Sequence, residues 1–377
     1  MIYFDNSATT PPIIPPTWVP ASPAPPILAN PSSPHALGIT AERALATART
    51  TLASILGCTP AEVIFTSGGT ESNSLGLIGY ALAHHRKGLT FFAHPWEHPS
   101  ILQPLKFIKD QGLAEVVITP DINIEEIATK SPYPVLAISH INNETGDINP
   151  IGQLGKNLKA QNPASIIIVD NAQGFCKEPL GLANVDMLTL SGHKCHGPTG
   201  VGALFLNSKV RIKPLMYGGG QEGGLRPGTE NTGGVISMVQ AVEKLHVKQV
   251  EHHNHVATIK ALIHSVVDDL PHTYVNCASP NTSPYILNLS FLGLKGEVLV
   301  HALSQKGLCV SMGAACQSRK KDKSVLEAMG FKKDRAESAI RFSFSHLNTL
   351  EEAAMAKKII IGCVTDMRNM LGVNYGN

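Results

Sequence analysis

Between residues 40 and 206, apolar and polar positions alternate in blocks that predict helices and strands in turn. Runs of β-branched and aromatic residues are typical of buried strands. Such runs occur at 62–66, 89–93, 115–119, 134–139, 164–170, 186–191 and 202–206. Stretches with helical character separate most of them, and this order predicts a mostly parallel sheet with helices on both faces.

The first of the helical stretches has clear ends. Leu45, Ala48 and Leu52 fall on one face of a helix, and we expect Thr40 to cap its start and Gly57 to stop it. Before it, residues 11–34 are dense in proline, which has no backbone N–H and breaks helices. We expect an extended surface segment there.

The second half has a different order. A long helical region at 233–269 is followed by further elements, which we expect as strands at 285–291, 308–312 and 339–344 and helices at 296–306 and from Leu350. A chain of 377 residues exceeds the usual size of one core. We therefore predict a large domain over 14–250 and a small α+β domain formed by 1–13 and 251–377.

Composition excludes several classes of protein. A net charge of +2 favours neither direct nucleic-acid binding nor attachment to a membrane. No apolar run is long enough to cross a bilayer, and the first residues are not a secretory signal, so we expect a cytoplasmic protein. The seven cysteines are odd in number and contain no C-x-x-C pair, which argues against a disulfide framework and a zinc ribbon.

Three polar groups follow strands of the predicted sheet, where ligands collect in such folds. The turn "SGGT", residues 67–70, opens a helix and could bind a phosphate through free N–H groups. Asp170 ends a buried strand, and Lys194 follows another. Each has an ordinary alternative: a structural glycine turn, a helix cap or loop aspartate, and an exposed loop lysine.

The segment "SGHKCHG" allows a second interpretation, because His193, Cys195 and His196 could ligate a metal. That interpretation would have to explain the glycine turn and Asp170 separately. Pyridoxal phosphate accounts for all three groups at once, since it needs a phosphate site, an acid partner for its ring nitrogen and an amine for its aldehyde. We therefore predict this cofactor and no metal.

The same residues also carry a family resemblance. The chain resembles the cysteine desulfurases of the NifS/IscS type over nearly its whole length, which implies a fold type I pyridoxal phosphate enzyme with a mostly parallel seven-stranded sheet in its large domain. It also implies a homodimer that converts L-cysteine to L-alanine and leaves a persulfide on the enzyme. The matching segments are "YFDNSATTPP", "NPSSPHALG", "FTSGGTES", "HINNETG", "VDNAQG", "SGHKCHGPTGVGAL", "GGGQEGGLRPGTEN" and "AIRFSFS".

The resemblance implies a role for each cofactor-site residue. Lys194 would form the Schiff base, Asp170 would pair with the pyridine nitrogen, and His98 would stack on the ring and could move protons. The remaining contacts would be Asn143 and Gln173 to the ring hydroxyl, Gly69, Thr70, Ser191 and His193 to the phosphate, and Thr229 to the phosphate of the neighbouring subunit.

The resemblance also implies the substrate-side residues. Arg341 would bind the substrate carboxylate, and Asn6 would line the same pocket. Cys316 would be the nucleophile on a flexible loop, where the basic residues 319–321 would favour a thiolate. It would pass sulfur to an acceptor protein for iron–sulfur cluster assembly or tRNA thiolation.

Three alternatives stay open. A selenocysteine lyase or an aminotransferase would use the same fold and cofactor. A partner-dependent sulfur-relay subunit is the third, because the loop reads "SMGAAC" where the family usually has S-S-G-S-A-C. Met312 and Ala314 remove two hydroxyl groups from this loop.

Overall fold

The computed structural model describes residues 1–14, 29–312 and 323–372, and the chain divides into two compact units. We call them the large unit, Pro11–His140 with Asn149–Val247, and the small unit, Met1–Thr10 with Ile141–Ile148 and Lys248–Asn377. The predicted boundaries left 141–148 in the large domain. The segment belongs to the small unit because Ile141 and Ile148 pack into the hydrophobic core of that unit.

A seven-stranded sheet forms the centre of the large unit, in the order β2-β8-β7-β6-β5-β3-β4. The sheet is parallel except for β8, which runs antiparallel to both of its neighbours. This confirms the predicted fold class. The strands are β2 (Val63–Thr66), β3 (Leu89–Ala93), β4 (Glu115–Ile118), β5 (Tyr133–Ser139), β6 (Ile166–Asp170), β7 (Met187–Ser191) and β8 (Gly202–Leu206).

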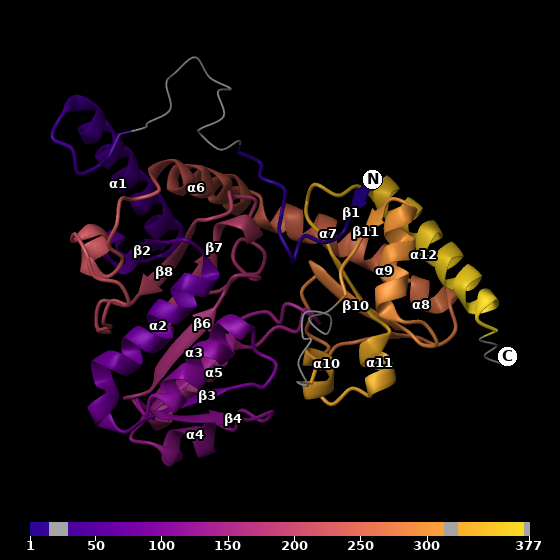
Figure 1. Ribbon diagram of the computed structural model, residues 1–377, viewed down its shortest axis with the longest axis horizontal. Coiled ribbons are helices and arrows are strands. Elements are labelled where there is room, and N and C mark those ends of the chain that lie inside the picture. The colour runs from indigo at the N-terminus through magenta and orange to yellow at the C-terminus, as the bar shows by residue number, and fades with distance from the viewer. Residues whose placement is uncertain (15–28, 313–322, 373–377) are drawn as a thin grey trace. The chain divides into compact units, whose positions relative to one another are not determined.

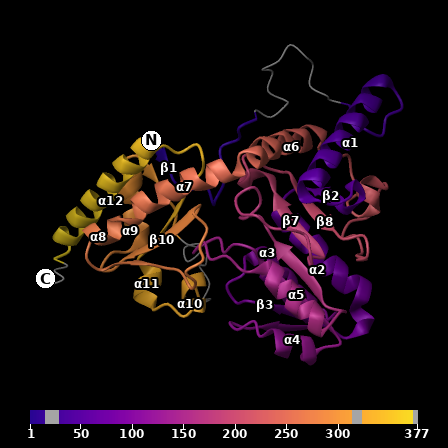
Figure 2. The same cartoon turned by 180° about the vertical axis from the view of Figure 1, so that it is seen from behind.

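Helices cover both faces of this sheet (Figure 1, and Figure 2 from behind). Side chains of α1, α4, α5 and α6 share one apolar cluster with one set of strand residues, and those of α2 and α3 share another with the alternate set. The helices of the large unit are α1 (Ala36–Leu56), α2 (Gly69–His84), α3 (Pro99–Asp110), α4 (Ile124–Lys130), α5 (Ile151–Gln161) and α6 (Thr232–Val247), with short 3₁₀ turns at Pro60–Glu62, His85–Lys87, Gly192–Lys194 and Gln221–Gly224.

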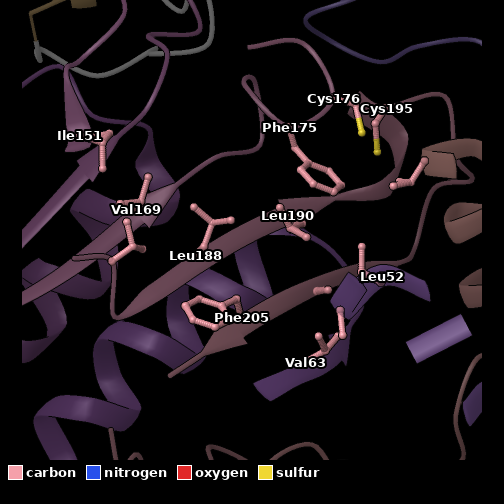
Figure 3. Close-up of a cluster of buried hydrophobic side chains, with 14 of the residues drawn as sticks. Leu52, Val63, Ile151, Val169, Phe175, Cys176, Leu188, Leu190, Cys195 and Phe205 are labelled. Atoms are coloured by element: carbon pink, nitrogen blue, oxygen red, sulfur yellow. The ribbon is translucent and has the colours of Figure 1, made fainter. Parts of the chain in front are cut away.

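The strands read as continuous apolar runs because both faces of the sheet are buried. In β6, Val169 lies in the first cluster and Ile168 in the second. Figure 3 shows the first cluster, in which Leu188 and Leu190 of β7 lie near Phe205 of β8. Each such side chain contributes about 1.5–3 kcal/mol when it is fully buried.

The start of the first helix was predicted wrongly. Helix α1 begins at Ala36, and His35 caps it by accepting a hydrogen bond from the backbone N–H of Gly38 at 3.2 Å. Thr40 lies inside the helix, one turn after Ala36. Its hydroxyl donates a hydrogen bond to the carbonyl of Ala36 and therefore does not cap the helix. Gly57 ends the helix with φ of 73°, as the sequence predicted.

The small unit contains a three-stranded antiparallel sheet and a two-stranded parallel pair. The pair joins β1, near the N-terminus, to β11, so the first residues of the chain pack in this unit. Its strands are β1 (Ile2–Tyr3), β9 (Thr273–Val275), β10 (Ile286–Phe291), β11 (Leu308–Cys309) and β12 (Ala339–Ser343). Its helices are α7 (Gln249–His264), α8 (Val266–Asp269), α9 (Gly296–Gln305), α10 (Val325–Ala328), α11 (Lys333–Glu337) and α12 (Leu350–Met370).

Two expectations for the second half need correction. The long helical region is interrupted at Lys248 and again at Ser265, so it forms α6, α7 and α8. The strand expected at 308–312 ends at Cys309, and beyond it Ser311 forms an isolated bridge with Arg341 of β12. Across the described ranges, no helix combines the length and apolar character needed to cross a membrane.

Candidate active site

The polar residues singled out in the large unit meet at the carboxyl edge of its sheet. Strand β6 ends at Asp170, which pairs in register with Ser139 of β5 and Thr189 of β7. Because β8 is antiparallel to both β2 and β7, those two strands run in the same direction, and β2 also ends at this edge. The glycine turn, Asp170 and Lys194 are therefore brought to one side of the sheet.

Asp170 is a buried carboxylate with both oxygens occupied. Oδ1 accepts a hydrogen bond from the backbone N–H of Ala172 at 2.9 Å, and Oδ2 accepts one from Nδ2 of Asn73 at 2.7 Å. The side chain is 8% exposed. These N–H donors hold both carboxylate oxygens in place at the sheet edge, where an organic cation could pair with them.

His98 lies at the start of α3, where it serves as the N-cap. Its Nδ1 accepts from the backbone N–H of Ser100 at 3.1 Å and lies 2.7 Å from the Ser100 hydroxyl oxygen. Burial lowers the pKa of His98 below its usual 6.5; the charge of Asp170 opposes this shift and that of Lys194 adds to it. His98 is thus close enough to both residues to interact with their charges.

The glycine turn allows the backbone at the start of β8 to pack closely against it. Gly68 has φ of 151°, and a Cβ at Gly202 would lie 2.6 Å from the Gly68 Cα. The turn places Gly69 and Thr70 in the first turn of α2, whose leading N–H groups have no partner within the helix. Such a helix start binds anions.

Ser191 and His193 flank the other side of this turn. A Cβ built on Gly69 would lie 3.6 Å from the Ser191 Cβ, so the two segments are in contact. Burial, together with the positive charges of Lys194 and Lys177, lowers the pKa of His193 to about 4. His193 is therefore neutral at neutral pH and can donate one N–H. Lys194 ends the 3₁₀ turn and is half-buried.

Two more predicted cofactor contacts lie in the large unit. Gln173 is 8% exposed, and its Oε1 accepts from the Lys177 ammonium at 3.4 Å, which turns its amide nitrogen away from that lysine. Thr229 is exposed, between the 3₁₀ turn at Gln221–Gly224 and α6. Within the ranges described, no hydrogen bond ties Thr229 to the glycine turn of its own chain.

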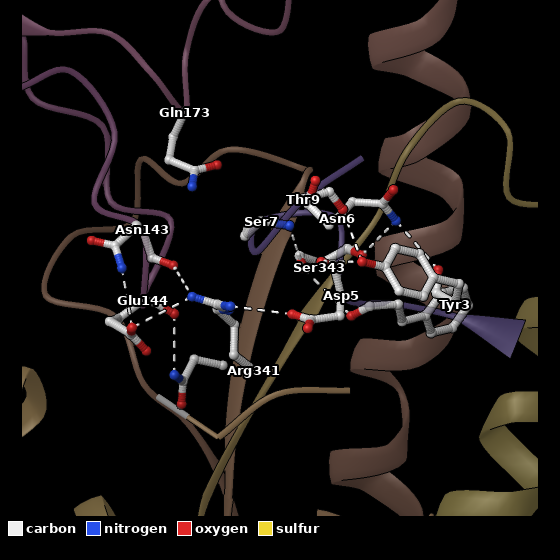
Figure 4. A network of polar contacts seen from close by, with 12 residues as sticks. Tyr3, Asp5, Asn6, Ser7, Thr9, Asn143, Glu144, Gln173, Arg341 and Ser343 are labelled. Carbon is white, nitrogen blue, oxygen red and sulfur yellow. Dashed lines mark hydrogen bonds and ion pairs between the residues drawn. The ribbon is translucent and has the colours of Figure 1, made fainter. Parts of the chain in front are cut away.

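The remaining predicted residues lie in the small unit, where Arg341 of β12 is the centre of a charged network (Figure 4). Nη1 donates to the carbonyl of Asn143 at 2.9 Å and lies 3.4 Å from Glu144 Oε1, while Nη2 lies 3.2 Å from Asp5 Oδ1. Its Nε has no hydrogen-bond partner within the described chain. Two carboxylates therefore hold the guanidinium in place and leave one N–H unused.

Asn143 and Asn6 are anchored in the same unit. Asn143 donates from Nδ2 to Glu144 Oε1 at 3.1 Å. Asn6 is 2% exposed, and its Nδ2 donates to the carbonyl of Ser343 at 3.0 Å. Its nitrogen thus ties the N-terminal segment to β12.

Cys316, the predicted nucleophile, lies outside the described residues, as does Ala314. Cys195 is buried, with a pKa raised by burial to about 12, and its sulfur donates to the carbonyl of Gly192. Its side chain lies beside Cys176 in the apolar cluster of Figure 3. In the part of the chain that the structure describes, no set of three His, Cys, Asp or Glu side chains converges as a metal site.

Sequence reasoning missed Glu97, next to His98. This carboxyl is 2% exposed; Oε2 accepts from the backbone N–H of Ser139 at 3.0 Å, and Oε1 lacks a hydrogen-bond partner among the residues described. Burial, aided by the charge of nearby Asp170 and opposed by the hydrogen bond from Ser139, raises its pKa to about 8. Glu97 is therefore mainly protonated at neutral pH, which limits the negative charge around Asp170.

Glu97→Gln is expected to become more stabilising, relative to the wild type, as pH rises. The pKa of Glu97 in the folded state, about 8, exceeds its ordinary 4.5. The stability that this group contributes is complete below the lower value and is lost as pH rises towards the higher one. Glutamine does not titrate, so the difference in unfolding free energy should change by on the order of 3 kcal/mol across this window.

Thermal unfolding at intervals from about pH 5 to about pH 8 would measure this difference. Glu125→Gln, at an exposed position in the first turn of α4, is the matched control and should show no such trend. A melting-temperature difference for Glu97→Gln that stays constant or falls with rising pH would contradict the assignment.

Comparison with known proteins places this architecture in a family. Residues 2–355 match the model of the class-V aminotransferases. The chain is 33% identical to the cysteine desulfurase IscS of Proteus mirabilis (strain HI4320) and 34% identical to that of Vibrio atlanticus (strain LGP32), in both cases over 98% of this chain and 94% of the relative.

A solved structure agrees with the sequence relatives. A NifS-like protein superimposes with a TM-score of 0.88 at 31% identity, covering 97% of this chain and 99% of that one. The match extends through both units, because the aligned residues span nearly the entire sequence. The chain therefore belongs to the class-V aminotransferase family and, within it, to the cysteine desulfurases of the NifS/IscS type.

Proposed function

We propose that this protein is a pyridoxal phosphate-dependent cysteine desulfurase that converts L-cysteine to L-alanine and retains the sulfur as a persulfide on Cys316. The observation that carries the proposal is the carboxyl edge of the large sheet. There a buried carboxylate with two N–H donors, a lysine and a glycine turn at a helix start lie on one side of the sheet. Family membership supports the same reaction.

The residues present fit the cofactor. The start of α2 at Gly69, with Ser191 in contact and the neutral His193 nearby, offers uncharged donors to a phosphate. Asp170 offers a buried anion to a protonated ring nitrogen, and Lys194 offers an amine to an aldehyde. Pyridoxal phosphate, once bound, supplies an electron-withdrawing ring that makes the substrate Cα acidic.

The side chains of the large unit then divide the work. Asp170 is held in a fixed orientation because both of its oxygens accept hydrogen bonds. His98 presents a neutral imidazole, since burial lowers its pKa, and its Nε2–H can donate a hydrogen bond while Ser100 occupies Nδ1. The amine of Lys194 can accept the proton that leaves the substrate Cα. Proton transfer is thus proposed for Lys194 and hydrogen-bond donation for His98.

Arg341 is proposed to bind the substrate carboxylate. The fork of a guanidinium suits two carboxylate oxygens, and Nε of Arg341 has no partner within the described chain. Asp5 and Glu144 hold Nη2 and Nη1 on the opposite sides, so the orientation is set before substrate arrives. Asn6 and Asn143, anchored to the same network, are proposed to line this pocket.

Cys316 is proposed to take the sulfur. Its thiolate attacks the substrate sulfur; the new S–S bond forms as the substrate Cβ–S bond breaks, with that bonding pair left on the carbon side. Protonation of that carbon side gives L-alanine, and the persulfide remains for an acceptor thiol. The basic residues 319–321 in the sequence favour the thiolate.

Assembly and acceptor are part of the same proposal. Thr229 is exposed and makes no hydrogen bond to the glycine turn of its own chain within the described ranges. This agrees with a homodimer in which Thr229 contacts the phosphate of the partner subunit. The sulfur acceptor is proposed to be a protein thiol that serves iron–sulfur cluster assembly or tRNA thiolation.

Release of L-alanine from L-cysteine by the protein loaded with pyridoxal phosphate tests the proposal. With a thiol reductant to clear the persulfide, the wild type should turn over repeatedly, and Cys316→Ser should retain less than about one tenth of that rate, since serine is a far weaker nucleophile towards sulfur. Cys309→Ser, at a strand residue of the small unit, is the matched control and should keep the wild-type rate.

Other outcomes separate the alternatives. Alanine from L-selenocysteine alone, in a Cys316-independent reaction, would indicate a selenocysteine lyase. Consumption of a 2-oxo acid with amino transfer would indicate an aminotransferase. A cofactor-loaded wild type that releases no alanine even with reductant would contradict an autonomous desulfurase and favour the partner-dependent relay subunit.

A further inference from the structure

Asn73, on the second turn of α2, connects two residues of the proposed site. The side chain is 1% exposed. Its Nδ2 donates to Asp170 Oδ2 at 2.7 Å and to Ser100 Oγ at 2.9 Å, and its Oδ1 accepts from the Thr189 hydroxyl at 2.7 Å. One amide therefore joins α2, α3, β6 and β7 at the carboxyl edge of the sheet.

The chemistry of these partners allows only one orientation of the amide. An ionised carboxylate can only accept, so the atom that faces Asp170 must be nitrogen. Thr189 is fully buried, and its hydroxyl donates to the amide oxygen on the other side. Both Nδ2 hydrogens are then directed, one to Asp170 and one to Ser100.

Ser100 transmits this constraint to His98. Its hydroxyl oxygen accepts a hydrogen bond from Asn73, so the hydroxyl hydrogen is left to donate to His98 Nδ1. The Ser100 Oγ and His98 Nδ1 atoms are 2.7 Å apart. The backbone N–H of Ser100 also points at Nδ1, at 3.1 Å. With two donors on Nδ1, the neutral imidazole carries its proton on Nε2.

We propose that Asn73 is a positioning residue that holds the Asp170 carboxylate and, through Ser100, the Nε2–H tautomer of His98. Its catalytic consequence rests on the proposed function, but the hydrogen-bond coupling does not. The two groups are set by the same amide, so loss of that amide affects both together. A residue that served packing alone would affect neither group specifically.

Asn73→Leu tests this assignment, because leucine is similar in size and removes every polar contact. Asp170 Oδ2 loses its donor, so the pH midpoint of the visible absorption of the bound cofactor should shift by about one pH unit. Turnover of L-cysteine should fall about 10- to 100-fold, with KM changed less than about threefold, since Asn73 does not touch the substrate carboxylate site. Thr189→Val, which only frees the amide to rotate, should give a smaller shift of the same sign.

A second readout needs no cofactor. In protein labelled with ¹⁵N-histidine, the wild-type His98 should show a protonated Nε2 and an unprotonated Nδ1, assigned by comparison with His98→Gln. Asn73→Leu should raise the population of the Nδ1–H tautomer, because the Ser100 hydroxyl can then turn to accept from Nδ1 and only the backbone N–H of Ser100 still favours the Nε2–H form. This measurement stands even if the wild type releases no alanine, in which case the proposed function fails and the coupling is still decided.

Asn162→Leu is the matched control in the same unit. Asn162 Nδ2 donates to the carbonyls of Ala128 and Ser131 at 3.1 and 3.2 Å, at the C-terminal end of α5 and the opposite edge of the sheet. It should lower the melting temperature and leave the tautomer and the absorption midpoint unchanged. The assignment is overturned if Asn73→Leu keeps the wild-type tautomer and midpoint, or if Asn162→Leu alters them equally.

Discussion

Lys194→Ala is expected to abolish the reaction, with a loss of at least about 10³-fold in alanine release, because the proposed mechanism assigns both the bond to the cofactor aldehyde and acceptance of the Cα proton to this one amine. The half-buried position of Lys194, at the end of the turn after β7, places this amine near His98 and His193. Lys177 also lies close enough to His193 to affect its pKa, but its ammonium donates a hydrogen bond to Gln173.

Borohydride reduction of the loaded protein, followed by peptide mass analysis, measures this effect independently of activity. The wild type should carry the reduced cofactor on the peptide that contains Lys194. In Lys194→Ala, visible absorption typical of lysine-bound cofactor should be absent, and added methylamine should restore a small part of the activity. Lys209→Ala, at an exposed position after β8, should match the wild type. Labelling of another lysine in the wild type would refute the assignment.

Asp170→Asn is expected to lower alanine release by about 10²–10³-fold, because a neutral amide cannot stabilise a protonated ring nitrogen. The site adds a second cost. Asp170 accepts from Asn73 on one oxygen and from the backbone of Ala172 on the other. An asparagine has one oxygen only, so its NH₂ group would face another N–H donor in a buried position.

Two measurements separate these costs. Loss of bound cofactor on dialysis reports the missing charge, and the melting temperature of the cofactor-free protein reports the clash of donors. The loss of cofactor should increase and the melting temperature should decrease, whereas Asp121→Asn, at an exposed position beyond β4, should change neither. Full activity with retained cofactor in Asp170→Asn would show that another group balances the ring, and Asp170 would lose its proposed role.

Part of the site could be predicted because it depends on local rules. A buried β-branched run predicts that the polar residue at or just after its end lies at the edge of a sheet. This rule predicted the positions of Asp170 and Lys194. A glycine turn before a helical stretch predicts a helix start, which located Gly69 and Thr70. The predicted large sheet is confirmed for the same reason, since each strand is recognisable without its neighbours.

Other features escaped prediction because they depend on segments far apart in the chain. Asn73 resembles any polar helix residue until Asp170, Ser100 and Thr189 are placed around it. Arg341 could be named as a carboxylate binder, but its two acidic partners lie more than 190 residues away in sequence. No periodicity or spacing reports such contacts.

The division follows from the range of the forces involved. Residue propensity, apolar periodicity and turn residues act over a few consecutive residues, so they already specify the strands, the helices and the edge where the functional groups gather. The pKa of Glu97, the tautomer of His98 and the orientation of the Arg341 guanidinium depend on desolvation and on individual donors. Only the packed structure supplies those surroundings, because it brings together α2, α3, β6 and β7 in the large unit, and β12 with residues 5 and 144 in the small one.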